Sequence, residues 1–240
     1  MRSLYGAIVN TNKKEIMVSV DAVYQKVLAI ANKEQRGYIT PQEFNLFADH
    51  AQKDIFRQYF YDLERFERDA SSDIDSLIEQ KIQIFKQAPL EVTDGFVLPL
   101  DTYQIDDVWI SWENGERSTV QRIDRKEVQG IQSSPLLKTV LAPCYYVYNN
   151  TVYFLYTKSG PWRVSLIKNP TRPNWTYVIV GESAMFDDLV SGFMDFEIHA
   201  SEETLLVIKI LQLAGINIKD PQLVQLASQE EVKKIQQEKQ

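Results

Sequence analysis

The feature that most constrains this chain is a pair of apolar-striped helices within residues 19–66, joined by a short Gly-Tyr-Ile-Thr-Pro hinge. In the second helix, apolar residues recur at three- and four-residue steps, which places them along one face: Phe44, Phe47, Ala48, Ala51, Ile55, Tyr59, Leu63 and Phe66. Further aromatic residues lie beside or behind that stripe, and they exceed what a lone three-helix packing covers. We therefore predict an assembly surface on this helix, formed by Phe56, Tyr59, Phe60 and Tyr61.

Capping signals set the helix boundaries in the N-terminal third. Ser19 precedes apolar residues at helical spacing, which predicts a helix over 19–32. The run Thr40-Pro41-Gln42-Glu43 is a capping box with proline in the first helical position, so a second helix begins there. A third helix is expected over 72–87, before Pro89. Residues 1–15 have no such pattern, and we expect an arm.

Residues 90–180 have the composition of a β region, because aromatic and β-branched residues dominate and turn residues recur every eight to twelve positions. Tight hairpins are predicted at Asn114-Gly115 and Asn149-Asn150. Residues 124–139 have a weak helical pattern that Gly130 and Pro135 interrupt, so we expect a connection that contains one short helix. The segments WRVSLIK and WTYVIV are expected to extend the sheet to Val180.

The last part of the chain returns to helical patterns. A stripe over 186–193 predicts one helix, formed by Phe186, Leu189, Val190 and Phe193. Ser201 is the expected cap of LLVIKILQLAG, a segment apolar on all sides that protein must enclose, and Gly215 ends it. A final helix is predicted from Asp220-Pro221, with a polar end.

These patterns predict an α+β fold with an N-terminal helical hairpin, a third helix, a central antiparallel β domain and C-terminal helices. The predicted regions are 1–89, 90–181 and 182–240, and the two helical regions are expected to pack together as one domain. The chain has 240 residues, which is enough for a core that needs no disulfide or metal.

Charge and cysteine content exclude several classes of function. The chain has 33 acidic and 26 basic residues and a formal net charge of -7, which disfavours sequence-specific nucleic-acid binding. Cys144 is the only cysteine, so no intrachain disulfide and no cysteine-based metal cluster can form, and a reducing compartment is expected. No run of about 18 uncharged apolar residues and no signal-peptide pattern occurs, so we expect no membrane span and no cleaved signal.

One segment has partial calcium-loop spacing. Five residues occupy positions one, three, six, eight and twelve of the EF-hand pattern, namely Asn32, Glu34, Gly37, Ile39 and Glu43. Arg36 stands where an oxygen ligand belongs, and Gly37 is explained more simply as a left-handed turn residue. The sequence therefore does not favour a calcium site, and it predicts no metal and no cofactor.

Candidate catalytic residues are equally weak. His50 and His199 have no second ligand at metal spacing, and Cys144 lies in an apolar strand. The pair Asp106-Asp107 points to opposite faces of a strand, and the pair Asp187-Asp188 is typical of capping. No catalytic residue is predicted. The basic cluster Arg117, Arg122, Arg125 and Lys126 is either a contact for phosphate or an acidic partner, or a solvated strand edge.

Two segments resemble a known family. The run over residues 23–66, VYQKVLAIANKEQRGYITPQEFNLFADHAQKDIFRQYFYDLERF, resembles the N-terminal segment of structural proteins of crAss-like and related Bacteroidetes bacteriophages. Its signature is the turn Gly37-Tyr38-Ile39-Thr40-Pro41-Gln42-Glu43-Phe44-Asn45, set between a helix and an aromatic helix. The C-terminal EETLLVIKILQLAGINIKDPQLVQLASQEE is similar to the closing segment of the same group. Together they cover about a third of the chain.

The resemblance implies a structural protein of the virion neck, made in the cytoplasm of the bacterial host. Such a protein forms a homo-oligomeric ring, commonly of twelve copies, between the portal and other neck or tail ring proteins. The ring lines or surrounds the DNA channel, with passive contact to packaged DNA. A ring needs two different patches on each subunit, and the aromatic helix offers one.

Two alternatives stay open from the residues alone. One is an adaptor, outside any viral ring, that binds a partner helix in a groove. The other is an enzyme of unrecognised type. The size of the purified protein separates ring from adaptor, and a bound metal or cofactor would support an enzyme.

Overall fold

In the computed structural model, the chain divides into two compact units of different composition. Met1–Ile84 and Pro170–Gln240 form one, here called the helical unit, and Phe85–Asn169 form the other, the β unit. The structure describes residues 17–33, 38–69, 72–111, 117–134, 143–155 and 161–215, and within these no side chain of 64–77 or 111. The fold class is α+β, as predicted.

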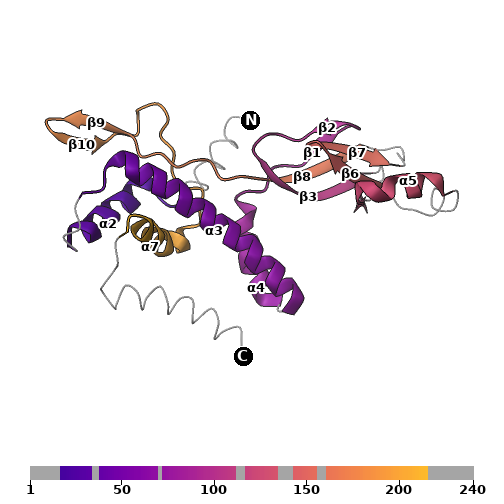
Figure 1. The fold of residues 1–240 in the computed structure, drawn as a ribbon, viewed down its shortest axis with the longest axis horizontal. Coiled ribbons are helices and arrows are strands. Elements are labelled where there is room, and N and C mark those ends of the chain that lie inside the picture. Colours follow the sequence, from indigo (N-terminus) through magenta and orange to yellow (C-terminus); the bar gives the residue numbers. More distant parts are fainter. Residues whose placement is uncertain are drawn as a thin grey trace, which may run out of the picture. The chain divides into compact units, whose positions relative to one another are not determined.

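Four helices build the described part of the helical unit (Figure 1). They are α2 (Val20–Lys33), α3 (Pro41–Asp69), α4 (Ser72–Gln83) and α7 (Glu203–Leu213), the last preceded by the 3-10 turn η1 (Ala200–Glu202). Helix α7 packs against both α2 and α3, and α4 packs against α3. The predicted starts of α2 and α3 are confirmed within one residue.

An aromatic core joins α2 and α3 to the segment that returns from the β unit. Trp175 is buried, and its ring centroid lies 4.3 Å from that of Tyr24, which in turn lies 4.6 Å from that of Phe44. The indole nitrogen of Trp175 donates a 2.9 Å hydrogen bond to Asp21, which satisfies its polar atom. Stripe residues of α2 and α3 are buried here because only one side of each helix meets this core.

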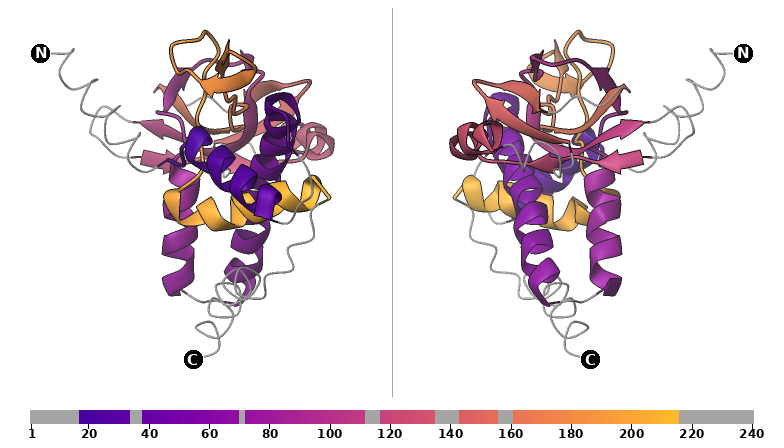
Figure 2. Two further views of the ribbon diagram at one scale, coloured as in Figure 1. Left: turned by 90° about the vertical axis from the view of Figure 1, so that its left-hand side faces the viewer. Right: turned by 90° about the vertical axis from the view of Figure 1, so that its right-hand side faces the viewer.

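The β unit holds two four-stranded sheets that share one apolar core (Figures 1 and 2). The first has the order β1 (Leu90–Val92), β8 (Trp162–Lys168), β3 (Thr102–Ser111) and β4 (Arg117–Thr119). The second has the order β2 (Phe96–Val97), β7 (Thr151–Leu155), β6 (Cys144–Tyr148) and β5 (Gln121–Arg122). All of these pairs are antiparallel except β5 with β6, which is parallel.

Turn chemistry positions the β unit's connections. Asn149 and Asn150 have φ of 46° and 58°, and they join β6 to β7 in the predicted hairpin. The short helix expected within 124–139 is α5 (Arg125–Ser133), capped by Asp124, whose side chain accepts from the backbone N–H of Lys126. The predicted turn at Asn114-Gly115 lies outside the described residues.

Three expectations near the unit boundaries need correction. Helix α4 ends at Gln83 rather than 87, because Gln87 already donates a backbone hydrogen bond of 2.8 Å to Leu166 of β8. WTYVIV does not extend a sheet of the β unit, since β9 (Tyr177–Val180) pairs with β10 (Ser183–Phe186) in a separate two-stranded hairpin of the helical unit. Ser201 is not the cap of α7: the N-cap of α7 is Glu202, without a side-chain hydrogen bond, and the side-chain cap lies one turn earlier, where His199 at the start of η1 accepts from Ser201 N–H.

The prediction of a helix over 186–193 is wrong. Phe186 ends strand β10, and Asp187 accepts a hydrogen bond of 2.9 Å from the backbone N–H of Leu189, which forms a local turn. Gly192 then adopts a φ of 96°, a value that interrupts a helix. Leu189 is 89% exposed, so the apparent apolar stripe does not face a core. The predicted arm and final helix lie outside the described residues.

Candidate interaction surfaces

The predicted assembly surface on α3 is mostly core. Phe56, Tyr59 and Phe60 are only 2%, 5% and 7% exposed, and the rings of Phe56 and Phe60 meet edge to face with centroids 4.9 Å apart. Tyr61 alone is exposed, at 67%. The expectation that all four form an open surface is therefore corrected for the three buried residues, because other parts of the chain cover a second side of α3.

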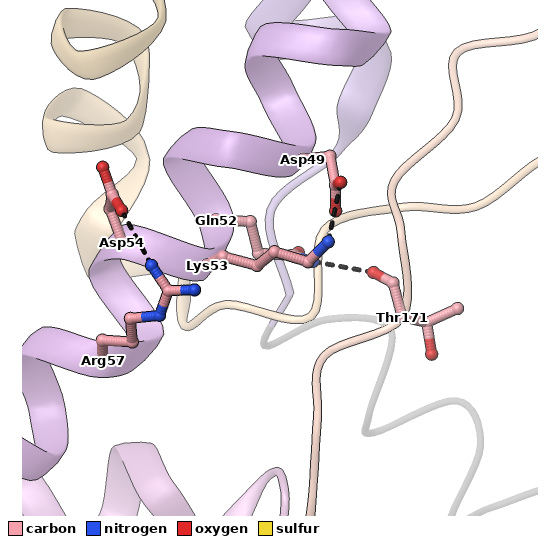
Figure 3. Close-up of polar contacts among 6 residues, drawn as sticks. All are labelled: Asp49, Gln52, Lys53, Asp54, Arg57 and Thr171. Atoms are coloured by element: carbon pink, nitrogen blue, oxygen red, sulfur yellow. Dashed lines mark hydrogen bonds and ion pairs between the residues drawn. The ribbon is translucent and has the colours of Figure 1, made fainter. Parts of the chain in front are cut away.

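Charged residues occupy an accessible side of α3 instead (Figure 3). Lys53 forms an ion pair with Asp49 at 2.8 Å, and Arg57 forms one with Asp54 at 3.7 Å. Gln52, by contrast, is fully buried and donates a 2.7 Å hydrogen bond to the backbone carbonyl of Thr171. This stretch of α3 thus offers solvent a polar face, and its apolar face is already used inside the protomer.

A buried ion pair closes the core near the end of α3. The ammonium of Lys81 on α4 pairs with the carboxylate of Glu202 in η1, and it lies 5.6 Å from the centre of the Tyr59 ring. Among the described residues, the Tyr59 hydroxyl has no hydrogen-bond partner, and burial, together with the negative charge of Glu202, raises the pKa of this phenol. The arrangement holds three segments together.

Several exposed apolar residues lie on the β9–β10 hairpin. Cross-strand pairs share a face of the hairpin, so Val178 and Met185 lie on one face together with Val180. All three side chains are exposed, and Ile179 near the turn is 72% exposed. A two-stranded ribbon has no other strand to cover this side. The face formed by Val178, Val180 and Met185 is called the outer hairpin face below.

The opposite face of the hairpin is anchored in the core. The rings of Tyr177 and Phe186 stack near Trp175, with centroids 5.6 Å and 6.0 Å from it. Asn45 of α3 fixes the adjacent backbone, since its side chain accepts from Trp175 N–H at 2.8 Å and donates to the Trp175 carbonyl at 3.1 Å. The hairpin is therefore held rigidly at its base while its outer face stays open.

A second apolar feature is a cleft of about 330 Å³ between α2 and α7. Apolar side chains make up most of its lining, and a 2.8 Å ion pair between Lys26 and Glu203 lies at the cleft. The other lining residues are Ala29, Ile30, Thr204, Val207 and Ile208. The cleft contains no His or Cys, so it favours an apolar guest over a metal or a catalytic role.

The basic cluster of the β unit covers aromatic rings. The guanidinium of Arg125 lies 3.5 Å from the centre of the Tyr148 ring, and that of Arg117 lies 5.5 Å from the centre of the Trp109 ring. Arg122 and Lys126 are exposed. Stacking of this kind is typical of a solvated strand edge, although the exposed cations remain able to contact an acidic surface.

Net charge is divided unevenly between the units. Residues 85–169 carry nine Lys or Arg and nine Asp or Glu, out of 26 and 33 in the whole chain. The β unit is therefore neutral overall, and the whole net charge of -7 belongs to the residues of the helical unit. An anionic surface repels nucleic-acid phosphates.

Candidate catalytic groups are used for structure. Cys144 is buried, and burial raises the pKa of its thiol, which disfavours the nucleophilic thiolate. Asp106 pairs with Lys86 at 3.0 Å and accepts from Ser165, whereas Asp107 accepts from the N–H of Val108. Of the two histidines, His50 is exposed and His199 caps η1.

Glu43, the twelfth residue of the calcium-like spacing, belongs to a capping box. Its carboxylate accepts from the Thr40 N–H at 3.0 Å and from the Thr40 hydroxyl at 2.8 Å, and these bonds lower its pKa. The Glu43 N–H donates back to the Thr40 hydroxyl. Residues 34–37 of the loop lie outside the described part. Within the described ranges, no group of three or more His, Cys, Asp or Glu is placed to hold a metal ion.

Comparison with known proteins adds no family. No family model matches the chain, and no curated protein matches it either. In the parts of the chain that are described, no helix is long and apolar enough to cross a membrane. Sequence reasoning missed both the outer hairpin face and the cleft. The alternation in SAMF after Gly181 was the available signal for the hairpin, while the cleft depends on packing between distant segments.

Proposed function

We propose that this chain is a structural component of the neck of a tailed-phage virion. It forms a ring with copies of itself, and the ring connects the portal to the tail around the DNA channel. Its partners are its own copies, the portal protein and other neck or tail ring proteins. The motif from Gly37 to Asn45 supports the family, and the outer hairpin face is the observation that carries the assembly role.

Leaving the outer hairpin face in water costs the protomer free energy. Val178, Val180 and Met185 form one contiguous apolar strip on a ribbon whose other face is anchored. Burial of such a strip in a contact releases the hydrophobic free energy that the isolated protomer forgoes. Both outer edges of the ribbon also lack a strand neighbour in the sheets of the described chain. A protein partner satisfies these demands better than a small molecule does.

Charge fits a position around DNA. The helical unit carries the whole negative excess of the chain, so a ring that presents it to the channel does not grip the phosphates. The genome then slides past without sequence-specific contact. A channel wall rich in Lys and Arg would contradict this part of the proposal.

A second candidate is an adaptor that binds a partner helix, and the α2–α7 cleft is the observation that favours it. Helix-in-groove recognition uses anchors at i, i+3, i+4 and i+7, which span about 10 Å at 1.5 Å per residue. The cleft lining runs from Lys26 to Ile30 and from Glu203 to Ile208, about 6–8 Å by the same rise. The cleft is therefore short for this role, and the ring proposal is preferred.

Particle size tests the proposal. Multi-angle light scattering and negative-stain images of the purified chain, alone and mixed with the portal protein of the same virus, are expected to reveal rings. Mixing matters because docking on the portal stabilises an assembly that is weak alone. Mass spectrometry of purified virions is expected to detect the chain. A monomer in every mixture, and its absence from virions, would refute the proposed function.

A further inference from the structure

We propose that the outer hairpin face of one copy docks into the α2–α7 cleft of the next copy. This inference rests on the proposed self-assembly and names its contact. The donor residues are Val178, Val180 and Met185. The acceptor is the cleft between α2 and α7.

The hairpin does not reach the cleft of its own copy. Its base is fixed to α3 by Asn45, and Trp175 is fixed to the side of α2 that carries Asp21 and Tyr24. At 100° per residue, Lys26 lies about 160° around α2 from Tyr24, so the cleft is on the far side of that helix. Figure 1 shows the hairpin above α3 and α7 below it.

Length and chemistry match the hairpin to the cleft. The cleft extends about 6–8 Å along its helices, and two residues on one face of a strand are about 7 Å apart. Val178 and Val180 therefore span the cleft where a helix with four anchors does not. Only one residue of the hairpin is charged, Glu182 in the turn, and the one Lys and one Glu that line the cleft, Lys26 and Glu203, already pair with each other. The two surfaces are therefore matched through their apolar side chains.

The contact is heterologous, because the donor and the acceptor are different surfaces of one unit. Every copy gives its hairpin to one neighbour and accepts the hairpin of another. Such contacts form a closed ring when a whole number of the rotations that relate neighbouring copies adds up to 360°. Both surfaces belong to the helical unit, so the proposed contact between neighbouring copies involves no residue of the β unit.

Engineered cysteines test the contact directly. Val180→Cys is made in one preparation and Ala29→Cys in another, since both native side chains are exposed and tolerate the change. The two preparations are mixed and treated with a short bismaleimide linker. Native Cys144 does not compete, because it is buried and its thiol pKa is raised. We expect a covalent dimer in the mixture and none in either preparation alone.

A chain that carries both substitutions is expected to give a ladder of covalent multimers. The matched control is Leu100→Cys, 99% exposed in the β unit, mixed with Ala29→Cys, and this pair is expected to give no dimer above background. The double variant Val180→Ser with Met185→Ser is expected to weaken association by about tenfold or more. Its thermal unfolding is expected to match that of the unmodified chain, which excludes misfolding.

The other outcomes separate this inference from the proposed function. Dimers of Val180→Cys with itself would show hairpin against hairpin and overturn the inference. Linkage of Ala29→Cys to portal alone would give the cleft another occupant and overturn it too. Multimers without any linked pair would also overturn it, while the ring proposal stands. A monomer in all conditions, with and without portal, would overturn both.

Discussion

The buried side-chain amide of Gln52 on α3 donates a 2.7 Å hydrogen bond to the backbone carbonyl of Thr171, 119 residues further along the chain. Its amide oxygen accepts from the N–H of Glu197 at 2.9 Å. The Glu197 carboxylate in turn accepts from Thr171 N–H at 2.7 Å. The Gln52 side chain thus connects two irregular backbone segments, at Thr171 and Glu197, to α3. In the sequence, the first segment precedes the β9–β10 hairpin and the second follows it.

Gln52→Ala is expected to destabilise the helical unit by about 2–4 kcal/mol, because a fully buried side chain is removed and the Thr171 carbonyl and the buried Glu197 N–H each lose this partner. Urea unfolding monitored by circular dichroism measures the free energy. Lys53→Ala is the matched control one residue away, and it removes a partly exposed i,i+4 ion pair, worth about 1 kcal/mol or less. Equal effects of the two changes would contradict the role assigned to Gln52.

The Lys81–Glu202 pair gives a second prediction. Lys81→Met leaves a buried carboxylate without its cation and is expected to cost about 3–5 kcal/mol. The double variant Lys81→Met with Glu202→Leu removes both charges and is expected to recover most of that loss. Chemical denaturation of the single and double variants checks this. A double variant as unstable as Lys81→Met would mean that packing, rather than the unpaired charge, sets the cost.

The capping box predicts a pH dependence at the start of α3. The Glu43 pKa is lowered by hydrogen bonds from Thr40, so the ionised carboxylate stabilises the folded helix start. This contribution is present above the ordinary glutamate pKa and is lost as the pH falls through the lowered value in the folded protein. NMR titration of Glu43 is expected to show the lowered pKa and its return towards normal in Thr40→Ala.

Thr40→Ala also removes the cap itself and is expected to cost about 1 kcal/mol near neutral pH. Gln42→Ala, at an exposed position of the same turn, is the control and is expected to change little. A Thr40→Ala variant with unchanged stability would show that neighbouring packing alone holds the helix start.

Burial of the aromatic residues on α3 changes what their substitution should do. Phe56→Ser is expected to destabilise folding by about 3–5 kcal/mol, because it empties a packed site. Tyr61→Ser, on the exposed side, is expected to stay within about 0.5 kcal/mol. Thermal unfolding separates the two. A stable Phe56→Ser protomer with lost assembly would restore Phe56 to an intersubunit surface.

Local chemistry explains which elements the sequence predicts well. The capping box at Thr40 and the turn at Asn149 act within a few residues, so their outcome does not depend on distant packing. The all-round apolar segment of α7 is enclosed as expected, since five of its residues are buried: Leu206, Val207, Ile208, Ile210 and Leu211.

Tertiary packing explains what the sequence does not predict. The second side of α3 at Phe56 is covered by protein that arrives from far along the chain, and no local pattern reveals this. Residues 183–193 satisfy both strand and helix spacing over a short window, and the turns at Gly181 and Gly192 decide for a hairpin and a loop. The cleft arises only where α2 meets α7, two segments about 170 residues apart.

Sedimentation velocity over a concentration series, with and without portal, is the most direct test of assembly through the hairpin. We predict multimers for the unmodified chain and a monomer for Val180→Ser with Met185→Ser. Val97→Ser, an exposed apolar residue of the β unit, is predicted to leave the multimers intact. A double variant that sediments as the unmodified chain does, or an unmodified chain that stays monomeric throughout, would contradict the account.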